Sequence, residues 1–139
     1  MTSEVPVRVA VVDDQPAVRR VFADLLETHG FEVVAEASNG HEAVLLCIRL
    51  QPDAVLMDAR MPVLDGIRAT RRIKETEPAT RVIVMTAYEQ DELSEASFAA
   101  GADAFALKGL SGAELARLVW ETVNGGPRAR SPLLQEVTS

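Results

Sequence analysis

The sequence predicts an α/β fold, a three-layer sandwich in which helices cover both faces of a five-stranded parallel sheet. One observation and one general rule support this prediction. Short apolar runs recur along the chain with helix-like sequence between them, which is typical of βα units. Right-handed crossovers between such units then place helices on both faces of one sheet. A chain of 139 residues is one domain by length, so all five units can share it.

The expected strands, in chain order, lie at 7–12, 31–37, 54–57, 82–85 and 104–107. The second strand alternates apolar and polar residues, which indicates a position near the edge, whereas the other four are apolar enough for burial on both faces. The strand order 2-1-3-4-5, that of flavodoxin-like (βα)5 folds, would make the first and third strands neighbours at the point where the winding reverses.

Helix-like sequence follows each strand. The first helix begins at Pro16, because proline is tolerated in the first turn, and it ends at Gly30. Its core-facing stripe follows helical spacing and consists of Val18, Val21, Phe22, Leu25 and Leu26. The helix expected over 91–101 has a weaker inward face, formed mainly by Leu93, Ala96 and Ala100. Little burial should therefore anchor that helix.

The last helix begins with the capping box Ser111-Gly112-Ala113-Glu114. Its apolar stripe consists of Leu115, Leu118, Val119 and Val123. Trp120 falls off this stripe, so part of its ring should be exposed. The ring can serve a homodimer through the final helix, in contact with the first helix of a second copy, or it can pack on a neighbouring helix.

Composition limits the partners and the location. The net charge of −7 argues against DNA binding by this chain alone, because affinity for nucleic acid depends on clustered Lys and Arg. No apolar run approaches the ~18 residues of a membrane span, and the N-terminus lacks the pattern of a signal peptide. A cytoplasmic location and no membrane contact are expected. Cys47 lies in an apolar stretch and is expected to be buried.

Polar residues stand at the carboxyl ends of four expected strands. Asp13 and Asp14 follow the first strand, Asp58 the third, Thr86 the fourth and Lys108 the fifth. Because the carboxyl ends of parallel strands meet at one edge of a sheet, these side chains should share a crevice. Crowded carboxylates need a cation, and Mg²⁺ suits Asp14 and Asp58, with Asp13 assisting through water.

The same crevice suits phosphoryl transfer. A carboxylate can act as a nucleophile and form an aspartyl phosphate, while the protein positions the group and balances its charge. Lys108 would supply positive charge beside Mg²⁺, and Thr86 would supply a hydroxyl donor. Two other functions fit less well on this fold. A flavin phosphate would want Ser, Thr and Gly after the first strand, and an aspartate phosphatase would want an acid–base partner beside Asp58.

Four stretches of the chain resemble the receiver domains of two-component response regulators. They are Val11–Asp14, Met57–Gly66, Met85–Ala87 and Leu107–Lys108. The resemblance extends from about Val7 to Asn124. The chain departs from many receivers by having Phe105 where they carry Tyr, and Gly109 where they carry Pro after the lysine. A cis peptide before Gly109 is therefore not expected.

The resemblance implies that Asp58 accepts a phosphoryl group from a sensor histidine kinase. It also implies that the three aspartates bind Mg²⁺ together with the backbone carbonyl of Arg60, and that Thr86 and Lys108 contact the phosphoryl group. Such a domain is not an enzyme in the usual sense. It promotes only its own Mg²⁺-dependent phosphorylation from a phosphodonor and its own slow dephosphorylation.

The residues around Asp58, the Leu107-Lys108-Gly109 ending and the tail after Pro127 are most similar to the NarL/LuxR type of regulator. Members of that type carry a helix-turn-helix DNA-binding domain after a linker. Residues 1–126 are therefore expected to form a receiver domain, and residues 127–139 a linker toward an output domain that is not in this chain and that controls transcription. The alternative is a stand-alone receiver that acts by phosphorelay or by binding another protein.

Overall fold

The computed structural model describes residues 5–87, 91–125 and 129–130. Strands and helices alternate along the chain, which confirms the five expected βα units. The elements are β1 (Arg8–Val12), α1 (Pro16–Thr28), β2 (Glu32–Ala37), α2 (Gly40–Leu50), β3 (Ala54–Asp58), α3 (Gly66–Thr76), β4 (Arg81–Thr86), α4 (Asp91–Ala99), β5 (Ala104–Leu107), α5 (Gly112–Val123) and β6 (Ala129–Arg130).

The strands form one parallel sheet in the order β2-β1-β3-β4-β5-β6, so the expected order of the first five strands is confirmed. The sixth strand was not expected. Its two residues, Ala129 and Arg130, pair with Ala104 and Phe105 of β5, within the segment expected to be a linker. A strand of two residues without an apolar run gives no periodic signal in the sequence. The rest of 127–139 lies outside the described residues.

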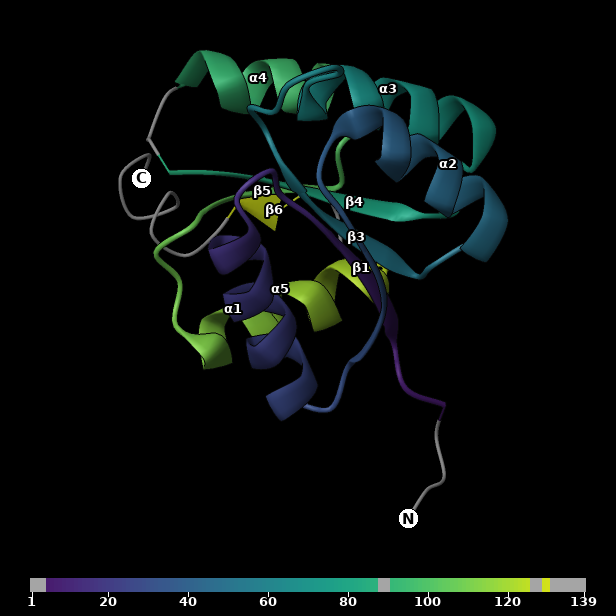
Figure 1. Ribbon diagram of the computed structural model, residues 1–139. Helices are drawn as coiled ribbons and strands as arrows, with labels where there is room; N and C mark the ends of the chain where they lie inside the picture. Colours follow the sequence, from purple (N-terminus) through teal and green to yellow (C-terminus); the bar gives the residue numbers. More distant parts are fainter. Residues whose placement is uncertain (1–4, 88–90, 126–128, 131–139) are drawn as a thin grey trace.

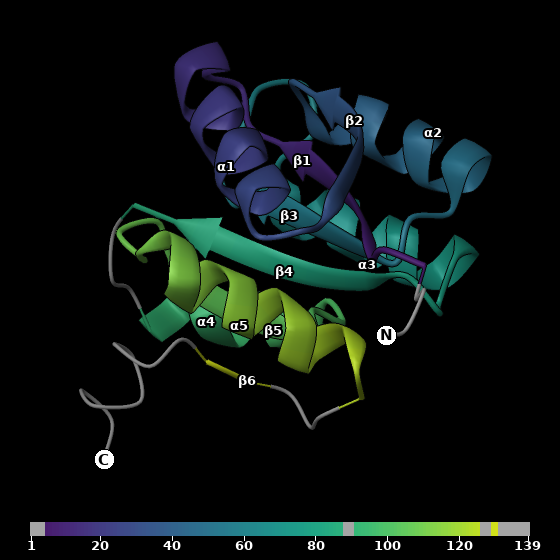
Figure 2. The same ribbon diagram turned by 90° about the horizontal axis from the view of Figure 1, so that it is seen from below.

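Helices cover both faces of the sheet and bury two separate apolar cores. α2, α3 and α4 lie on one face, and α1 and α5 lie on the other (Figure 1). Seen from below, α1 and α5 lie in front of the strands (Figure 2). Successive residues of a strand serve opposite cores: Val9 and Val11 pack beneath α1 and α5, whereas Ala10 and Val12 face α2 and α3. This double burial explains why the central strands are continuous apolar runs.

Two expectations for the helix faces were wrong. Val21 was placed on the inner stripe of α1 but is 55% exposed, because it lies at the margin of the buried face. Ala96 was placed inward on α4 but is exposed, and Ser94 and Ser97 occupy the buried side instead. The spacing of apolar residues predicts which face of a helix is buried, but it does not predict where the buried face ends. Alanine is small enough to be tolerated on the buried or the exposed face. The weak apolar face expected for α4 is confirmed.

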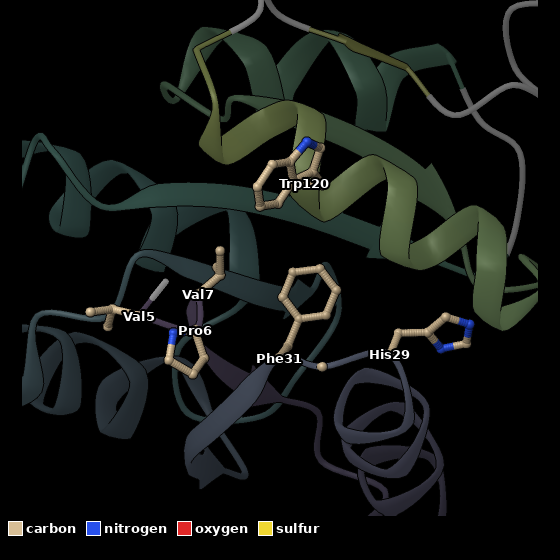
Figure 3. Close-up of a pocket in the computed structure, with 7 residues that line it drawn as sticks. Val5, Pro6, Val7, His29, Phe31 and Trp120 are labelled. Atoms are coloured by element: carbon tan, nitrogen blue, oxygen red, sulfur yellow. The ribbon is translucent and has the colours of Figure 1, made fainter. Parts of the chain in front are cut away.

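The final helix is as expected, with both hydrogen bonds of the Ser111–Glu114 capping box present. Trp120 is 52% exposed. Its indole ring borders an open pocket of about 330 Å³ at the end of the sheet where the strands begin, together with Phe31, Val7 and the loop at His29 (Figure 3). Cys47 is buried, and burial raises the pKa of its thiol to about 12, so it is a packing residue. Among the described residues, no helix combines the length and apolar character needed to cross a membrane.

Candidate functional site

The polar residues at the strand ends come together as the sequence predicts. Asp13 and Asp14 directly follow β1, and Asp58 is the last residue of β3, the strand beside β1. Thr86 ends β4, and Lys108 directly follows β5. The sheet order makes these strands successive neighbours, so their ends form one edge over the centre of the sheet.

Three carboxylates form the acidic part of the site. One oxygen each from Asp13, Asp14 and Asp58 lies within 4.8 Å of the others. Asp13 is 1% exposed and Asp58 is 8% exposed, whereas Asp14 faces solvent. Two buried carboxylates and one open carboxylate match the donor set of a hard cation that keeps part of its water shell. The residues present therefore fit a divalent cation such as Mg²⁺.

Lys108 lies between the two buried carboxylates. Its Nζ lies 2.7 Å from Oδ2 of Asp13 and 3.1 Å from Oδ1 of Asp58. Burial works to lower the pKa of Lys108, but the hydrogen bond to Asp13 and the charges of both carboxylates outweigh it, so the pKa is raised. The ammonium is thus held in its charged form between the two acids. The Lys108 N–H also donates to the carbonyl of Thr86 at 2.9 Å, which ties the ends of β4 and β5 together.

Asp58 is a weaker acid than an ordinary aspartate. Burial raises the pKa of its carboxyl group, and the negative charge of Asp13 raises it further, against the lowering effect of Lys108. The Arg60 N–H lies 3.5 Å from Oδ1 of Asp58, at the long limit for a hydrogen bond. The ionised form that a nucleophile requires therefore depends on its cationic neighbour.

Asp13 is fixed through its backbone as well as through its carboxylate. Oδ1 accepts the N–H of Gln15 at 2.9 Å, and the Asp13 N–H donates to the carbonyl of Ala37 at 3.1 Å. The Asp13 carbonyl accepts Nη1–H of Arg19 at 2.7 Å. Neither Gln15 nor Arg19 was predicted from the sequence. A backbone N–H leaves no sequence signal, and an arginine on a helix six residues beyond the strand end resembles any solvated charge.

Glycine is required where α3 approaches the end of β3. A Cβ atom on Gly66 would collide with the carbonyl oxygen of Asp58 and press on Met57. The Gly66 N–H donates to the carbonyl of Ala59 at 3.0 Å, which closes the connection between β3 and α3. Asp65 caps α3 by accepting the N–H of Arg68 at 2.8 Å.

The site opens into a pocket of about 330 Å³. Residues from all four strand ends line it, namely Asp14, Gln15, Val18, Asp58, Arg60, Thr86, Ala87 and Lys108. Thr86 is 2% exposed, and its carbonyl already binds the Lys108 N–H. Beneath the pocket, Phe105 is fully buried in the core, and the peptide that joins Lys108 to Gly109 is trans, as expected. A small anion in the pocket would lie beside a carboxylate nucleophile and an ammonium group.

Comparison with known proteins agrees with this geometry. Residues 9–119 match the family described as the response regulator receiver domain. The chain belongs to this family. It is 36% identical over 134 residues to the transcriptional regulatory protein LiaR of Bacillus subtilis (strain 168), covering 96% of this chain and 64% of LiaR. It is also 37% identical over 117 residues to the chemotaxis protein CheY of Bacillus subtilis (strain 168), covering 84% of this chain and 98% of CheY.

Among solved structures, the chain is similar to a two-component response regulator of the LuxR family from Aurantimonas sp. SI85-9A1. The TM-score is 0.88 with 34% sequence identity, and the alignment covers 95% of this chain and 94% of that one. The expected likeness to NarL/LuxR regulators is confirmed. The chain spans between 23% and 64% of the length of three longer curated relatives.

Proposed function

We propose that this receiver domain is switched by a phosphoryl group on Asp58. The observation that carries the proposal is the setting of that carboxylate. Asp58 ends β3 and is 8% exposed, and its Oδ1 lies 3.1 Å from the Lys108 ammonium. It borders a pocket at this edge that is large enough to admit a small anion. The other two carboxylates lie close enough to Asp58 to hold a cation with it.

The proposed step is a direct phosphoryl transfer. An Asp58 carboxylate oxygen attacks the phosphorus of a phosphohistidine on a sensor histidine kinase, and a new O–P bond forms as the P–N bond breaks. The electron pair of the broken bond stays on the imidazole nitrogen, so the protonated, cationic phosphohistidine ring leaves as neutral imidazole. The product is an acyl phosphate. Lys108 and Thr86 would bind its oxygens from the side of β4 and β5.

Mg²⁺ is proposed as the cation, held by Asp13, Asp14, Asp58 and the backbone carbonyl of Arg60. The clustering of three carboxylate oxygens within 4.8 Å supports this assignment. When bound, the ion supplies charge that offsets the negative oxygens of the transferred group. Of the protein's own groups, Asp13 stays hydrogen-bonded to the Gln15 N–H, and Lys108 can turn from Asp58 toward the phosphoryl oxygens.

The consequence of phosphorylation is proposed to be control of transcription through a helix-turn-helix domain that is not in this chain, toward which residues 127–139 form a linker. The length of relatives such as LiaR, a transcriptional regulatory protein of which this chain spans 64%, supports this proposal. The alternative is a stand-alone receiver, and the match to 98% of CheY supports that reading. The gene sequence downstream of residue 139 would decide between the two. This chain alone is expected not to bind DNA, because its net charge is −7.

Phosphorylation by acetyl phosphate tests the assignment of Asp58. Intact-mass spectrometry should show one added phosphoryl group in the presence of Mg²⁺ and none with a chelator. Asp58→Asn should abolish the addition, because an amide cannot form the acyl phosphate. Asp53→Asn, a change at the opposite end of β3, should leave it unchanged. Modification of Asp58→Asn at the wild-type rate would overturn the proposal.

A further inference from the structure

Arg19 links the acidic site to the edge of the sheet. Nη1–H donates to the carbonyl oxygen of Asp13 at 2.7 Å, and Nε–H donates to Oε1 of Glu36 on β2 at 3.1 Å. The Arg19 side chain is 19% exposed, and that of Glu36 is 28% exposed, so both contacts are partly shielded from water. A planar guanidinium held at two points has little freedom to rotate.

Among the described residues, the other neighbours of Asp13 bind its carboxylate and its N–H, whereas Arg19 binds its carbonyl. The Asp13 carboxylate is bound by Lys108 and the Gln15 N–H, and the Asp13 N–H is bound by the Ala37 carbonyl. Arg19 holds the carbonyl, which belongs to the peptide unit that joins Asp13 to Asp14. That planar unit includes the N and Cα atoms of Asp14, so its orientation influences the direction of the Cα–Cβ bond of Asp14.

Asp14 depends on this backbone more than the other two acids do. Asp13 and Asp58 are buried and bound by Lys108, whereas Asp14 is exposed. Within the described part of the chain, no side chain donates a hydrogen bond or forms an ion pair to the Asp14 carboxylate. Among the described contacts, the backbone at the Asp13–Asp14 peptide is thus what directs Asp14 toward the other two carboxylates.

We propose that Arg19 is a positioning residue for the cation site, acting through the Asp13 carbonyl, with Glu36 orienting the guanidinium. The inference rests on the proposed function, because it assumes that the three aspartates bind Mg²⁺. It extends the site to a residue that contacts neither the cation nor the phosphoryl group. Groups that orient metal ligands from behind typically change metal affinity about 10- to 100-fold when they are removed.

If Arg19 is replaced, its two possible roles, as a charge and as a positioning group, predict opposite changes in Mg²⁺ affinity. A guanidinium beside an acidic cluster repels a cation, so loss of its charge would tighten Mg²⁺ binding if Arg19 acted only through its field. Loss of the hydrogen bond to the Asp13 carbonyl would weaken Mg²⁺ binding, because Asp14 would sample other directions. The direction of the change therefore separates the two roles.

The chain offers a matched control in Arg20. Its Nη1 lies 2.9 Å from Oε2 of the same Glu36, and its other partners are Asp24 and Glu27 on α1, so it shares the salt bridge without the contact to Asp13. Arg19→Met and Arg20→Met both keep a long side chain and lose one charge. Comparing the two removes the effect of net charge and of the Glu36 contact.

The experiment is calorimetric titration of the full chain with MgCl₂, followed by acetyl phosphate labelling over a range of Mg²⁺ concentrations. Arg19→Met should raise the Mg²⁺ dissociation constant about tenfold, and Arg20→Met should stay within about twofold of wild type. Labelling of Arg19→Met should need correspondingly more Mg²⁺ for its half-maximal rate while approaching the wild-type rate at saturation. Arg19→Lys, which keeps one donor for the carbonyl, should recover part of the affinity.

Three outcomes would count against these ideas in different ways. Equal or tighter Mg²⁺ binding by Arg19→Met, beside a wild type that binds Mg²⁺, would overturn the role of Arg19 and leave the proposed function standing. Equal weakening in Arg19→Met and Arg20→Met, with matching losses of thermal stability, would also overturn it, because the effect would then belong to the salt bridge on Glu36. A wild type that binds no Mg²⁺ would overturn the proposed function and this inference with it.

Discussion

The ionised carboxylate that the proposed reaction requires of Asp58 is expected to destabilise the folded protein. The Asp58 carboxylate must be ionised to act as a nucleophile, yet burial raises its pKa and the charge of Asp13 raises it further. Lys108 offsets only part of this, since it is shared with Asp13. Sites of this kind commonly cost a protein some stability, which is recovered when the destabilising group is replaced.

Asp58→Asn should therefore stabilise the metal-free protein at pH 7. A group whose folded-state pKa lies above its unfolded value favours folding below its unfolded pKa, and this contribution is lost as pH rises through the folded pKa. At pH 7 the wild type has lost that contribution, so the neutral amide should gain about 1 kcal/mol, or roughly 3 °C in Tm. The gain should shrink toward pH 4.

Thermal unfolding in a chelating buffer at both pH values checks this prediction. Asp24→Asn, a change of a carboxylate whose side chain is 65% exposed, serves as the control and should leave Tm nearly constant. A lower Tm for Asp58→Asn at pH 7 would mean that the ion pair to Lys108 outweighs the burial of the carboxyl group.

Gly66→Ala should destabilise the protein although alanine favours helices. The added methyl group would meet the carbonyl of Asp58, which cannot move without disturbing the end of β3. We expect a loss of about 3 kcal/mol from this overpacking, against a gain of about 1 kcal/mol in helix propensity. Gly109→Ala is the control, since a Cβ atom at that position would meet nothing within 4 Å. Chemical denaturation would measure both, and a Gly66→Ala midpoint at or above wild type would contradict the prediction.

At the scale of elements, α4 is held less firmly than its neighbours. Its buried side presents Ser94 and Ser97 where other helices present large apolar groups. Ser97 Oγ donates to the Leu93 carbonyl at 2.6 Å, whereas Ser94 Oγ is buried and has no hydrogen-bond partner among the residues that the structure describes. An unsatisfied buried hydroxyl opposes the seating of the helix. α4 is the helix that follows β4, the strand that ends at Thr86.

Ser94→Ala should seat α4 more firmly, with a gain of about 1 kcal/mol. Hydrogen exchange should slow across α4, while the exchange of α2 stays at its wild-type rate. Ser97→Ala is the matched control and should not slow exchange, because its hydroxyl already has a partner. Faster exchange of α4 in Ser94→Ala than in wild type would show that the hydroxyl favours the seated helix.

The elements also show where sequence patterns lose their power. The inner strands were predictable because burial on both faces makes each of them a continuous apolar run. The margin of α1 at Val21 and the rotation of α4 at Ala96 were not, since both depend on how a helix packs on the sheet. β6 was not predicted, because a strand of two residues is too short to show an alternating apolar pattern.

At the scale of the whole molecule, topology made the candidate site predictable. Residues 13, 58, 86 and 108 are distant in sequence, but each ends or directly follows a strand of the same parallel sheet, so the strand order brings them together. The contacts by which other residues hold these site residues in place were not predictable. Arg19 reaches a backbone carbonyl, and no side-chain pattern marks a carbonyl as a partner. A sequence shows which groups can do chemistry more readily than which groups hold them.

One aromatic residue, Trp120, is exposed at the surface of the layered fold. Trp120 is 52% exposed on α5, on the face of the sheet that α5 shares with α1 (Figure 2). Its ring borders the pocket with Phe31 and Val7, so an apolar surface continues from α5 to the start of the sheet (Figure 3). Aromatic side chains are enriched at the centres of protein interfaces. We propose that a second copy of the phosphorylated domain binds through α5 at this ring.

Sedimentation of the domain labelled by acetyl phosphate tests this proposal. Trp120→Ala should weaken self-association at least about tenfold, or roughly 1.4 kcal/mol, because truncation of a central aromatic residue removes its buried contact. Leu45→Ala is the matched control, since Leu45 is 50% exposed on α2 at the opposite face of the sheet. The control should self-associate as wild type does. Equal dimer affinity in wild type and Trp120→Ala would remove the ring from the interface, and a larger loss in Leu45→Ala would move the interface to α2.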